Sequence, residues 1–265
     1  MSFRDLHRKG NPFILANAWD IGSAKMLAGL GAEAIATSSA AYAFTLGRPD
    51  GGTVTRDEAL AHAQDLVSAV TVPVSGDFEN GFGHAPETVA ETVRLAAEVG
   101  LAGISIEDAA FPGDGAYSRD DATDRIRASA AVARALPGDF VLVARADGVM
   151  NGHYDIEEAL ARIRAFDDAG ADCLYVPLPQ TIDDLRRVIA ATDKPVNVLA
   201  AGPTYSALTR ADYAAMGAAR ISLGSALARV THRVIHDAAQ DMFGNGSFAS
   251  LSQAMPGDDV DALLT

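Results

Sequence analysis

The sequence predicts an α/β protein, a (β/α)8 TIM barrel with an extra C-terminal helical segment, and two observations predict it. Apolar runs of about four to eight residues alternate with amphipathic segments of ten or more, a pattern typical of a parallel sheet. The alternation occurs eight times in 265 residues, a usual length for one closed barrel. We expect residues 1–243 to form the barrel domain and residues 244–265 to form a helical tail.

Each expected strand is an apolar run, and each is followed by a segment with helical period. The strands are predicted at 13–19, 34–39, 72–79, 102–108, 140–147, 173–178, 195–200 and 219–225. The helices are predicted at 20–30, 55–70, 86–99, 120–136, 155–169, 182–191, 205–216 and 226–243. Between the second strand and the second helix we expect a long loop.

Residues at the expected boundaries support these elements. Thr55 and Glu58 form a capping-box pattern at the start of one helix. A glycine ends four of the helices and precedes the next strand, a joint that recurs at Gly31, Gly100, Gly170 and Gly217. An open doubly wound sheet is the alternative, but the glycine-rich dinucleotide loop is missing after the first strand.

The charge and cysteine content exclude several classes of function. The chain has 21 Lys and Arg against 35 Asp and Glu, a formal net charge of −14. Such a field repels phosphate backbones and anionic lipids, so we expect neither nucleic acid nor a membrane as partner. No apolar run approaches the roughly 18–20 residues of a membrane helix, and we expect no signal peptide in residues 1–10. One cysteine allows no intrachain disulfide, which fits a cytoplasmic location.

Acidic side chains gather at the ends of neighbouring predicted strands, where barrels carry their reactive groups. Asp77 and Glu79 are two residues apart, so both should project to one face of a strand. Glu107 ends the next strand, and Asp50 lies on a loop that could reach over them. Such carboxylates repel one another unless a cation lies among them. Oxygen ligands without a His/Cys cluster favour Mg²⁺ or Mn²⁺ over Zn²⁺.

Plainer interpretations stay open. Any one of these acids could be a solvated loop residue, since barrel rims are polar. Arg145 ends an apolar run, and an Arg buried there needs an anionic partner. That partner is either Asp147 or Glu107, in an internal salt bridge, or a substrate carboxylate or developing enolate oxygen.

Six segments, in this order, resemble the isocitrate lyase/phosphoenolpyruvate mutase superfamily, in its phosphonomutase-like branch. They are NAWD at 17–20, ATSS at 36–39, GRPDG at 47–51, DFENGFG at 77–83, IED at 106–108 and ARAD at 144–147. The resemblance covers about residues 11–230. The six segments in this order are specific for the superfamily, although each segment alone is weak evidence for it.

The resemblance implies roles for the matching residues. Asp77 would be the direct ligand of Mg²⁺, with Glu79, Glu107 and Asp50 holding the metal or its waters. Arg145 would contact the substrate's oxygen atoms, and Glu107 and Asp50 would join it as catalytic groups. The remaining matches are expected to bind the substrate or border its site, and they are Trp19, Asp20, Ser38, Ser39 and Ala40.

The implied function is a Mg²⁺-dependent lyase that cleaves a C–C bond of a small 2-oxo or 2-hydroxy carboxylic acid through a metal-stabilised enolate. Two departures bear on it. Isocitrate and methylisocitrate lyases carry a Lys-Lys/Arg-Cys-Gly-His loop after the fourth strand, where this chain has FPGDGAYS at 111–118. The mutase has a His on its sixth strand, where this chain has YVPL at 175–178.

Two other functions stay open. One is C–P chemistry, as a phosphoenolpyruvate or carboxyphosphonoenolpyruvate phosphonomutase or a phosphonopyruvate hydrolase. The other is a protein that binds a 2-oxo acid without catalysis. The resemblance also implies a homo-oligomer, a tetramer or dimer of dimers, with a C-terminal helix exchanged between subunits.

Other reactive residue types have ordinary interpretations beside functional ones. Cys173 starts a strand at the end of the barrel away from the expected site, so we expect a buried apolar residue. His84 and His153 lie on rim loops, where each is a surface histidine or an acid or base. His232 and His236 share a helix face without a third zinc ligand. The loop at 112–115 is a mobile lid or an ordinary loop.

Overall fold

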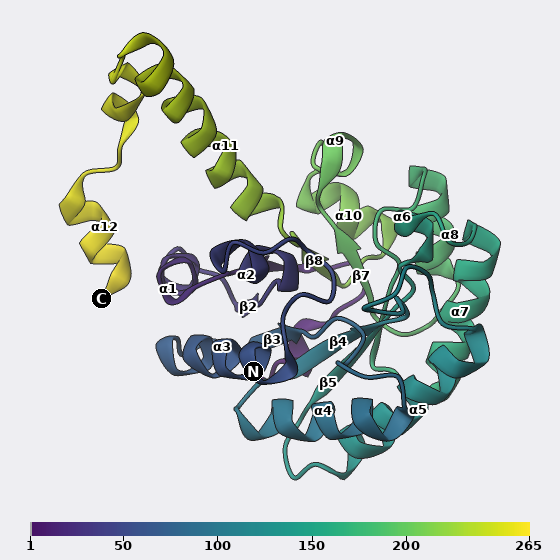
Figure 1. Cartoon of the computed structure of the whole chain (residues 1–265). Helices are drawn as coiled ribbons and strands as arrows, with labels where there is room; N and C mark the ends of the chain where they lie inside the picture. Colours follow the sequence, from purple (N-terminus) through teal and green to yellow (C-terminus); the bar gives the residue numbers. More distant parts are fainter. Residues whose placement is uncertain (1) are drawn as a thin grey trace.

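The predicted strands close into a barrel (Figure 1). The computed structural model describes residues 2–265, and within them eight parallel strands pair in chain order, with β1 also pairing with β8. This confirms the predicted (β/α)8 fold. The strands are β1 Phe13–Asn17, β2 Ala34–Ala36, β3 Val74–Asp77, β4 Gly103–Glu107, β5 Val141–Arg145, β6 Cys173–Tyr175, β7 Val196–Leu199 and β8 Arg220–Ser222.

Helices surround the strands (Figure 1). The α-helices are α1 Ile21–Gly29, α2 Ser39–Thr45, α3 Arg56–Ala69, α4 Pro86–Glu98, α5 Arg119–Ala135, α6 Gly148–Asn151, α7 Ile156–Ala169, α8 Ile182–Ala190, α9 Gly202–Tyr205, α10 Arg210–Met216, α11 Ala226–Gln240 and α12 Gly257–Leu264. Shorter turns are the 3₁₀ helices η1 Arg4–Leu6 and η3 Ala249–Gln253 and the π-helix η2 Asp241–Asn245.

Several elements differ from the expected ones, among them the short helix α6, which was not expected. The loop after β2 contains α2, because the Ser38 side chain accepts a hydrogen bond from the Ala41 N–H and caps a helix there. The helix expected at 205–216 begins only at Arg210, as α10, because Thr209 caps its start, and the separate short helix α9 precedes it. The last barrel helix ends at Gln240 and passes into η2.

Side-chain alternation along each strand separates two cores. In β5, Val141 and Val143 pack inside the barrel, whereas Leu142 and Ala144 pack against the surrounding helices. With a period of two, Arg145 therefore points inward at the carboxyl end. Phe3 and Leu6 belong to the inner cluster, so the N-terminal segment closes the opposite end of the barrel.

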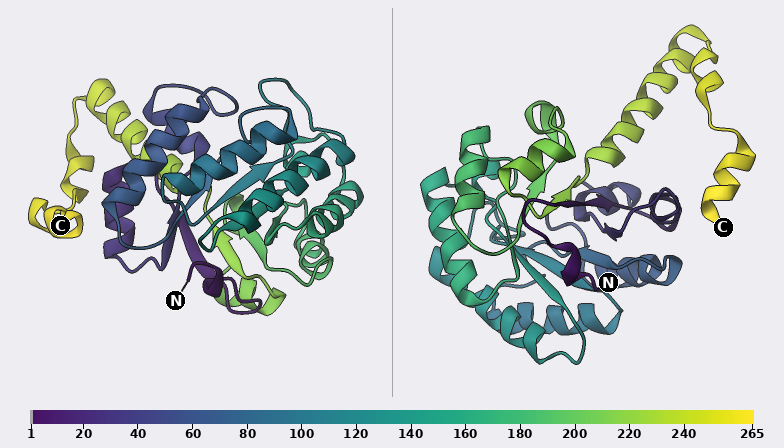
Figure 2. Two further views of the ribbon diagram at one scale, coloured as in Figure 1. Left: turned by 90° about the horizontal axis from the view of Figure 1, so that it is seen from below. Right: turned by 180° about the vertical axis from the view of Figure 1, so that it is seen from behind.

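The C-terminal segment leaves the barrel and returns to it. Helix α11 extends away from the strands, and α12 lies beside α1 (Figures 1 and 2). The Lys25 ammonium donates to the Leu264 carbonyl oxygen at 2.7 Å and ties the tail to α1. Among residues 2–265 there is no helix with the length and apolarity needed to cross a membrane.

Candidate active site

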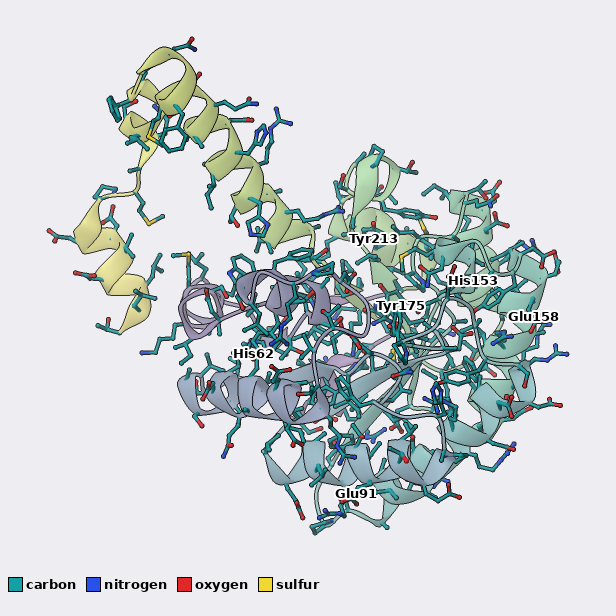
Figure 3. All side chains as sticks on the ribbon, in the orientation of Figure 1. His62, Glu91, His153, Glu158, Tyr175 and Tyr213 are labelled. Carbon is teal, nitrogen blue, oxygen red and sulfur yellow. The ribbon has the colours of Figure 1, made fainter. Side chains whose placement is uncertain are left out.

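A cavity of about 280 Å³ opens at the carboxyl ends of the strands. All eight strands contribute a lining residue, as the alternation predicts for inward positions. Tyr175 of β6 lies near the centre of the barrel and lines this cavity (Figure 3). The loops after the strands form its walls.

Arg145 is the centre of a buried ion-pair network. Its Nη1 donates to Asp77 Oδ1 at 2.7 Å, and its Nη2 lies 2.9 Å from Glu107 Oε2. Asp147 accepts from Nε at 3.1 Å and from Nη2 at 2.6 Å, a bidentate contact. Both salt-bridge partners that the sequence suggested for Arg145, Asp147 and Glu107, are therefore present, and Asp77 is a third.

Asp77 is also held from the side of β2. The Ser39 N–H and hydroxyl both donate to Asp77 Oδ2, at 3.0 and 2.9 Å. The Thr37 hydroxyl accepts from the Asp77 N–H at 2.8 Å. These contacts place the carboxylate between Arg145 and the first turn of α2.

Glu79 reaches the cavity by a different route from the expected one. Strand β3 ends at Asp77, and the Phe78 ring folds back over Gly76, where a Cβ would lie 2.5 Å from it. Glu79 then adopts a left-handed backbone with φ of 45°, which is costly for a non-glycine residue. Its side chain is buried at the cavity wall and accepts from the Gly52 N–H at 3.3 Å.

Crowding of the acids raises their pKa values. Burial and, next, the Asp77 carboxylate raise the pKa of Glu79 to about 7 and raise that of Asp50 above its usual range. Burial also raises the pKa of Glu107, although Arg145 opposes it. Burial raises the pKa of Asp147 to about 6, again against Arg145. The four groups are thus easier to protonate than ordinary carboxyls, which is typical of a functional site.

The structure brings most of the expected site residues to one place. The cavity is lined by Asp50, Asp77, Glu79, Glu107 and Arg145, and by Ser38, Ser39 and Ala40. Trp19 is not among the lining residues, and its carbonyl oxygen lies 3.0 Å from His62 Nε2. Asp20 is an exposed cap of α1.

A second layer of side chains supports the rim. Asp108 is buried, accepts from the Asp147 N–H at 2.9 Å, and is paired with Arg162 at 2.9 Å. Arg125 of α5 donates to the carbonyl oxygens of Asn80, Gly83 and His84, and so fixes the turn that carries Glu79.

Other cavity residues were not singled out from the sequence as site residues. Asp147, Tyr175, Arg220 and Ser222 all line the cavity. Asp147 follows Arg145 at a spacing of two, and a charged Arg220 begins an apolar run, so both carried a usable signal. The position of Tyr175 and Ser222 at the cavity could be identified only from the closed barrel, because the sequence gives no signal for it.

The remaining candidates fall outside this cavity. The His84 ring lies 2.7 Å from the Tyr117 hydroxyl on a neighbouring loop, and His153 Nε2 lies 3.6 Å from Asp114. Cys173 is buried in the inner core, where burial raises the pKa of its thiol to about 11.

The groups that could hold a metal ion are the four acids Asp50, Asp77, Glu79 and Glu107. Within residues 2–265, no three His, Cys, Asp or Glu side chains stand close enough together to ligate one ion directly. Asp77 and Glu107 are engaged by Arg145. A donor set of spaced carboxylates suits Mg²⁺, which usually keeps several of its waters.

These features define a class of protein, a (β/α)8 barrel with a buried acid and arginine cluster at the carboxyl ends of its strands. The family model for phosphoenolpyruvate phosphomutase matches residues 3–243. The chain therefore belongs to the phosphoenolpyruvate mutase/isocitrate lyase superfamily, as its six motifs suggested.

Two of the relatives with assigned activities are lyases. A 2,3-dimethylmalate lyase of Eubacterium barkeri is 33% identical over 70% of this chain and 65% of its own length. A 2-methylisocitrate lyase of Salmonella typhimurium is 32% identical over 88% and 82%. A crystal structure from Burkholderia cenocepacia J2315, described as a lyase/mutase, superimposes with a TM-score of 0.92 at 45% identity, covering 98% of this chain and 93% of that one.

Proposed function

We propose that the protein is a Mg²⁺-dependent lyase that cleaves a C–C bond of a small 2-oxo or 2-hydroxy carboxylic acid. The observation that carries the proposal is the single cavity that Asp50, Asp77, Glu79, Glu107 and Arg145 share at the catalytic end of the barrel. The lyase names of the two relatives support C–C chemistry.

The chain's own residues would bind and orient the acid. Ser38, Ser39 and Ala40 line the cavity at the start of α2 and would contact the substrate carboxylate there. Arg145 is fixed by three carboxylates and presents its charge to the substrate oxygen atoms. Mg²⁺ bound among the acids would supply electrostatic stabilisation of the charge that develops when the bond breaks.

Several raised pKa values support the metal proposal. Burial and mutual repulsion raise the pKa values of Asp50, Glu79 and Glu107. A divalent cation between these acids would offset the repulsion between their carboxylates. Arg145 alone offers one positive charge to the three acids that contact it. A cation of charge two is therefore the simplest complement to the cluster.

C–P chemistry is the second candidate, and the matching family description, phosphoenolpyruvate phosphomutase, favours it. Turnover of phosphonopyruvate should be compared with turnover of oxaloacetate and of substituted malates. A lyase converts the oxaloacetate or malate series and leaves phosphonopyruvate intact. Conversion of phosphonopyruvate alone would assign the C–P reaction instead.

The metal and the active site are tested together by Asp77→Asn. The variant keeps the side-chain shape but removes a negative charge that contacts Arg145 and Ser39. We expect loss of turnover by at least about 100-fold, together with loss of Mg²⁺-dependent thermal stabilisation. Asp120→Asn, an exposed change in the first turn of α5, is the control. Unchanged turnover in Asp77→Asn would show that the metal assignment is wrong.

A further inference from the structure

Asp108 is a buried carboxylate behind the active site. It follows Glu107 directly after β4 and is buried, but it is not among the residues that line the cavity. Its Oδ1 accepts from the Asp147 N–H at 2.9 Å. Its Oδ2 accepts from the Tyr154 hydroxyl at 2.6 Å and from Arg162 Nη1 at 2.9 Å. Asp108 therefore joins the backbone of Asp147 to two side chains outside the cavity.

Asp147 extends these contacts to Arg145. The Asp147 carboxylate holds the guanidinium through two hydrogen bonds, from Nε and from Nη2. A bidentate contact is sensitive to direction, because both of its hydrogen bonds must be aligned at once. Since Asp108 fixes the Asp147 N–H, it also influences the direction of the Asp147 side chain. The orientation of Arg145 therefore depends on groups that do not touch it.

The Tyr154 side chain is fixed in a position from which it donates to Asp108. Its ring packs against Gly148 of α6, where a Cβ would lie 2.1 Å from the ring, so a larger residue would displace it. The Arg162 guanidinium lies 4.4 Å from the centre of the ring. Burial and, next, the Asp108 carboxylate raise the pKa of Tyr154, so the hydroxyl keeps the proton that it donates.

Tyr154 and Arg162 differ in how they divide their donors. Arg162 also donates from Nη1 to the Tyr117 carbonyl oxygen and from Nε to Glu158. The Tyr154 hydroxyl has one proton, which it donates to Asp108. Loss of this hydroxyl would leave Asp108 Oδ2 with a donor that it shares with the loop before α5.

We propose that Tyr154 is a positioning residue for Arg145, which acts through Asp108 and Asp147 and does not touch the substrate. This inference rests on the proposed function, in which Arg145 contacts the oxygen atoms of the acid. Without the hydroxyl, Asp108 and the Asp147 backbone shift, and the guanidinium loses its alignment with those oxygen atoms. A donor stabilises developing charge only if it is already in place, so the effect should fall on kcat more than on KM.

Tyr154→Phe tests the proposal, because it removes the hydroxyl and keeps the ring. Tyr213→Phe is the matched control, since Tyr213 is buried outside the cavity and its hydroxyl donates to the Tyr205 carbonyl oxygen at 2.6 Å. The assay uses MgCl₂ with oxaloacetate, or with the substituted malate that the wild type converts. We expect Tyr154→Phe to lower kcat by about 10-fold with KM changed by less than about 2-fold. Tyr213→Phe loses the same kind of hydrogen bond and should keep kcat and KM within about 2-fold.

Substitutions at Tyr154 and Arg145 should not be additive, because one acts through the other. In a protein that already carries Arg145→Lys, Tyr154→Phe should change kcat by less than about 2-fold. A merely structural role of Tyr154 would lower kcat equally in both backgrounds. Such an equal loss, the same loss in Tyr213→Phe, or an unchanged kcat in Tyr154→Phe would each overturn the proposal.

The proposed function and this inference can fail separately. Absence of turnover and of Mg²⁺-dependent oxalate binding in the wild type would refute the function alone. A crystal structure of Tyr154→Phe then tests the positioning without a substrate. Displacement of the Arg145 guanidinium from Asp147 supports the proposal, and contacts of Arg145 that match those of the wild type contradict it.

Discussion

At the scale of single residues, the site is a set of charges that oppose one another in little space. Glu79 shows this most clearly, because it is buried, has a left-handed backbone and faces the Asp77 carboxylate. Strain and desolvation at one position are tolerated where function requires them. The energetic consequence can be measured without knowledge of the substrate.

The raised pKa of Glu79 predicts how stability depends on pH in metal-free protein. The carboxyl has a pKa of about 7 in the folded chain and an ordinary value of 4.5 in the unfolded chain, so the folded state binds the proton more tightly. Stability from this group is therefore present below pH 4.5 and is lost as the pH rises through 7. Glu79→Gln stays neutral and should gain about 1–3 kcal/mol relative to the wild type at pH 8, with little gain at pH 5.

Urea denaturation in EDTA at the two pH values measures this difference. Glu33→Gln, at an exposed position, is the matched control and should show no such pH dependence. If Glu79→Gln changes the unfolding free energy equally at pH 5 and pH 8, the pKa of Glu79 is not raised in the folded protein.

The contacts of Arg145 predict an effect of its substitution on catalysis. Lysine keeps the charge but cannot reproduce a fork that contacts Asp77, Glu107 and Asp147 at once. We expect Arg145→Lys to lower kcat/KM by about 100-fold or more on any acid that the wild type converts. Retention of full kcat/KM would mean that the guanidinium geometry has no part in the reaction.

The sequence predicted correctly those site residues whose side-chain direction is set by the alternation along a strand. Asp77, Glu107 and Arg145 are the last residues of β3, β4 and β5, at positions that point into the barrel, and all three line the cavity. Glu79 was expected to continue the strand, but it enters the cavity through a turn that depends on Phe78 packing over Gly76. Such a contact is tertiary and leaves no periodic pattern in the sequence.

At the scale of elements, helix α5 controls the turn between β3 and α4. Arg125 is buried on α5, stacks 4.1 Å from the centre of the Tyr117 ring, and donates to three carbonyl oxygens of that turn. Among residues 2–265 no carboxylate forms an ion pair with it, and Asp121 acts on it only at longer range. Three backbone carbonyls therefore accept the hydrogen bonds of this cation, which ties the turn to α5.

Arg125→Met should loosen the turn that carries Glu79 and Asn80. Loss of these hydrogen bonds leaves buried carbonyls unpaired, so we expect destabilisation by about 2–4 kcal/mol in urea denaturation. Arg127→Met on the exposed face of the same helix should cost less than about 1 kcal/mol. Equal effects of the two substitutions would contradict a specific contact between α5 and the turn.

Element boundaries were predictable where capping residues mark them. Thr55 caps α3 with the expected box, and Gly170 and Gly217 end α7 and α10 with positive φ. Helix α2 was not predicted, although Ser38 is a good cap, because its sequence SAAYAFT is too short to show a helical period. Its position matters, since its first turn contacts Asp77.

At the scale of the whole molecule, the C-terminal segment is the part that the barrel does not cover. Its exposed apolar side chains are Val230, Val234, Ile235, Phe243, Phe248, Leu251 and Met255. An apolar surface of this kind usually marks a protein interface. The homo-oligomer expected from the family resemblance is therefore a prediction with a defined surface.

Light scattering after gel filtration tests it. The wild type should have about four times the chain mass of 27.5 kDa. Val234→Asp should reduce that mass, because a charge at this position of α11 could not enter an apolar interface. Gln240→Lys, an exposed change on the same helix, should leave the mass unaltered. A monomeric wild type would refute the tetramer and leave the apolar surface without a partner.

The most direct test of the whole account is calorimetric titration of the purified, metal-free protein with Mg²⁺ in the presence of oxalate. We predict saturable binding of one ion per chain in the wild type and none in Asp77→Asn. Absence of Mg²⁺ and Mn²⁺ uptake by the wild type, with oxalate present, would contradict the claim that a divalent cation completes the acid cluster.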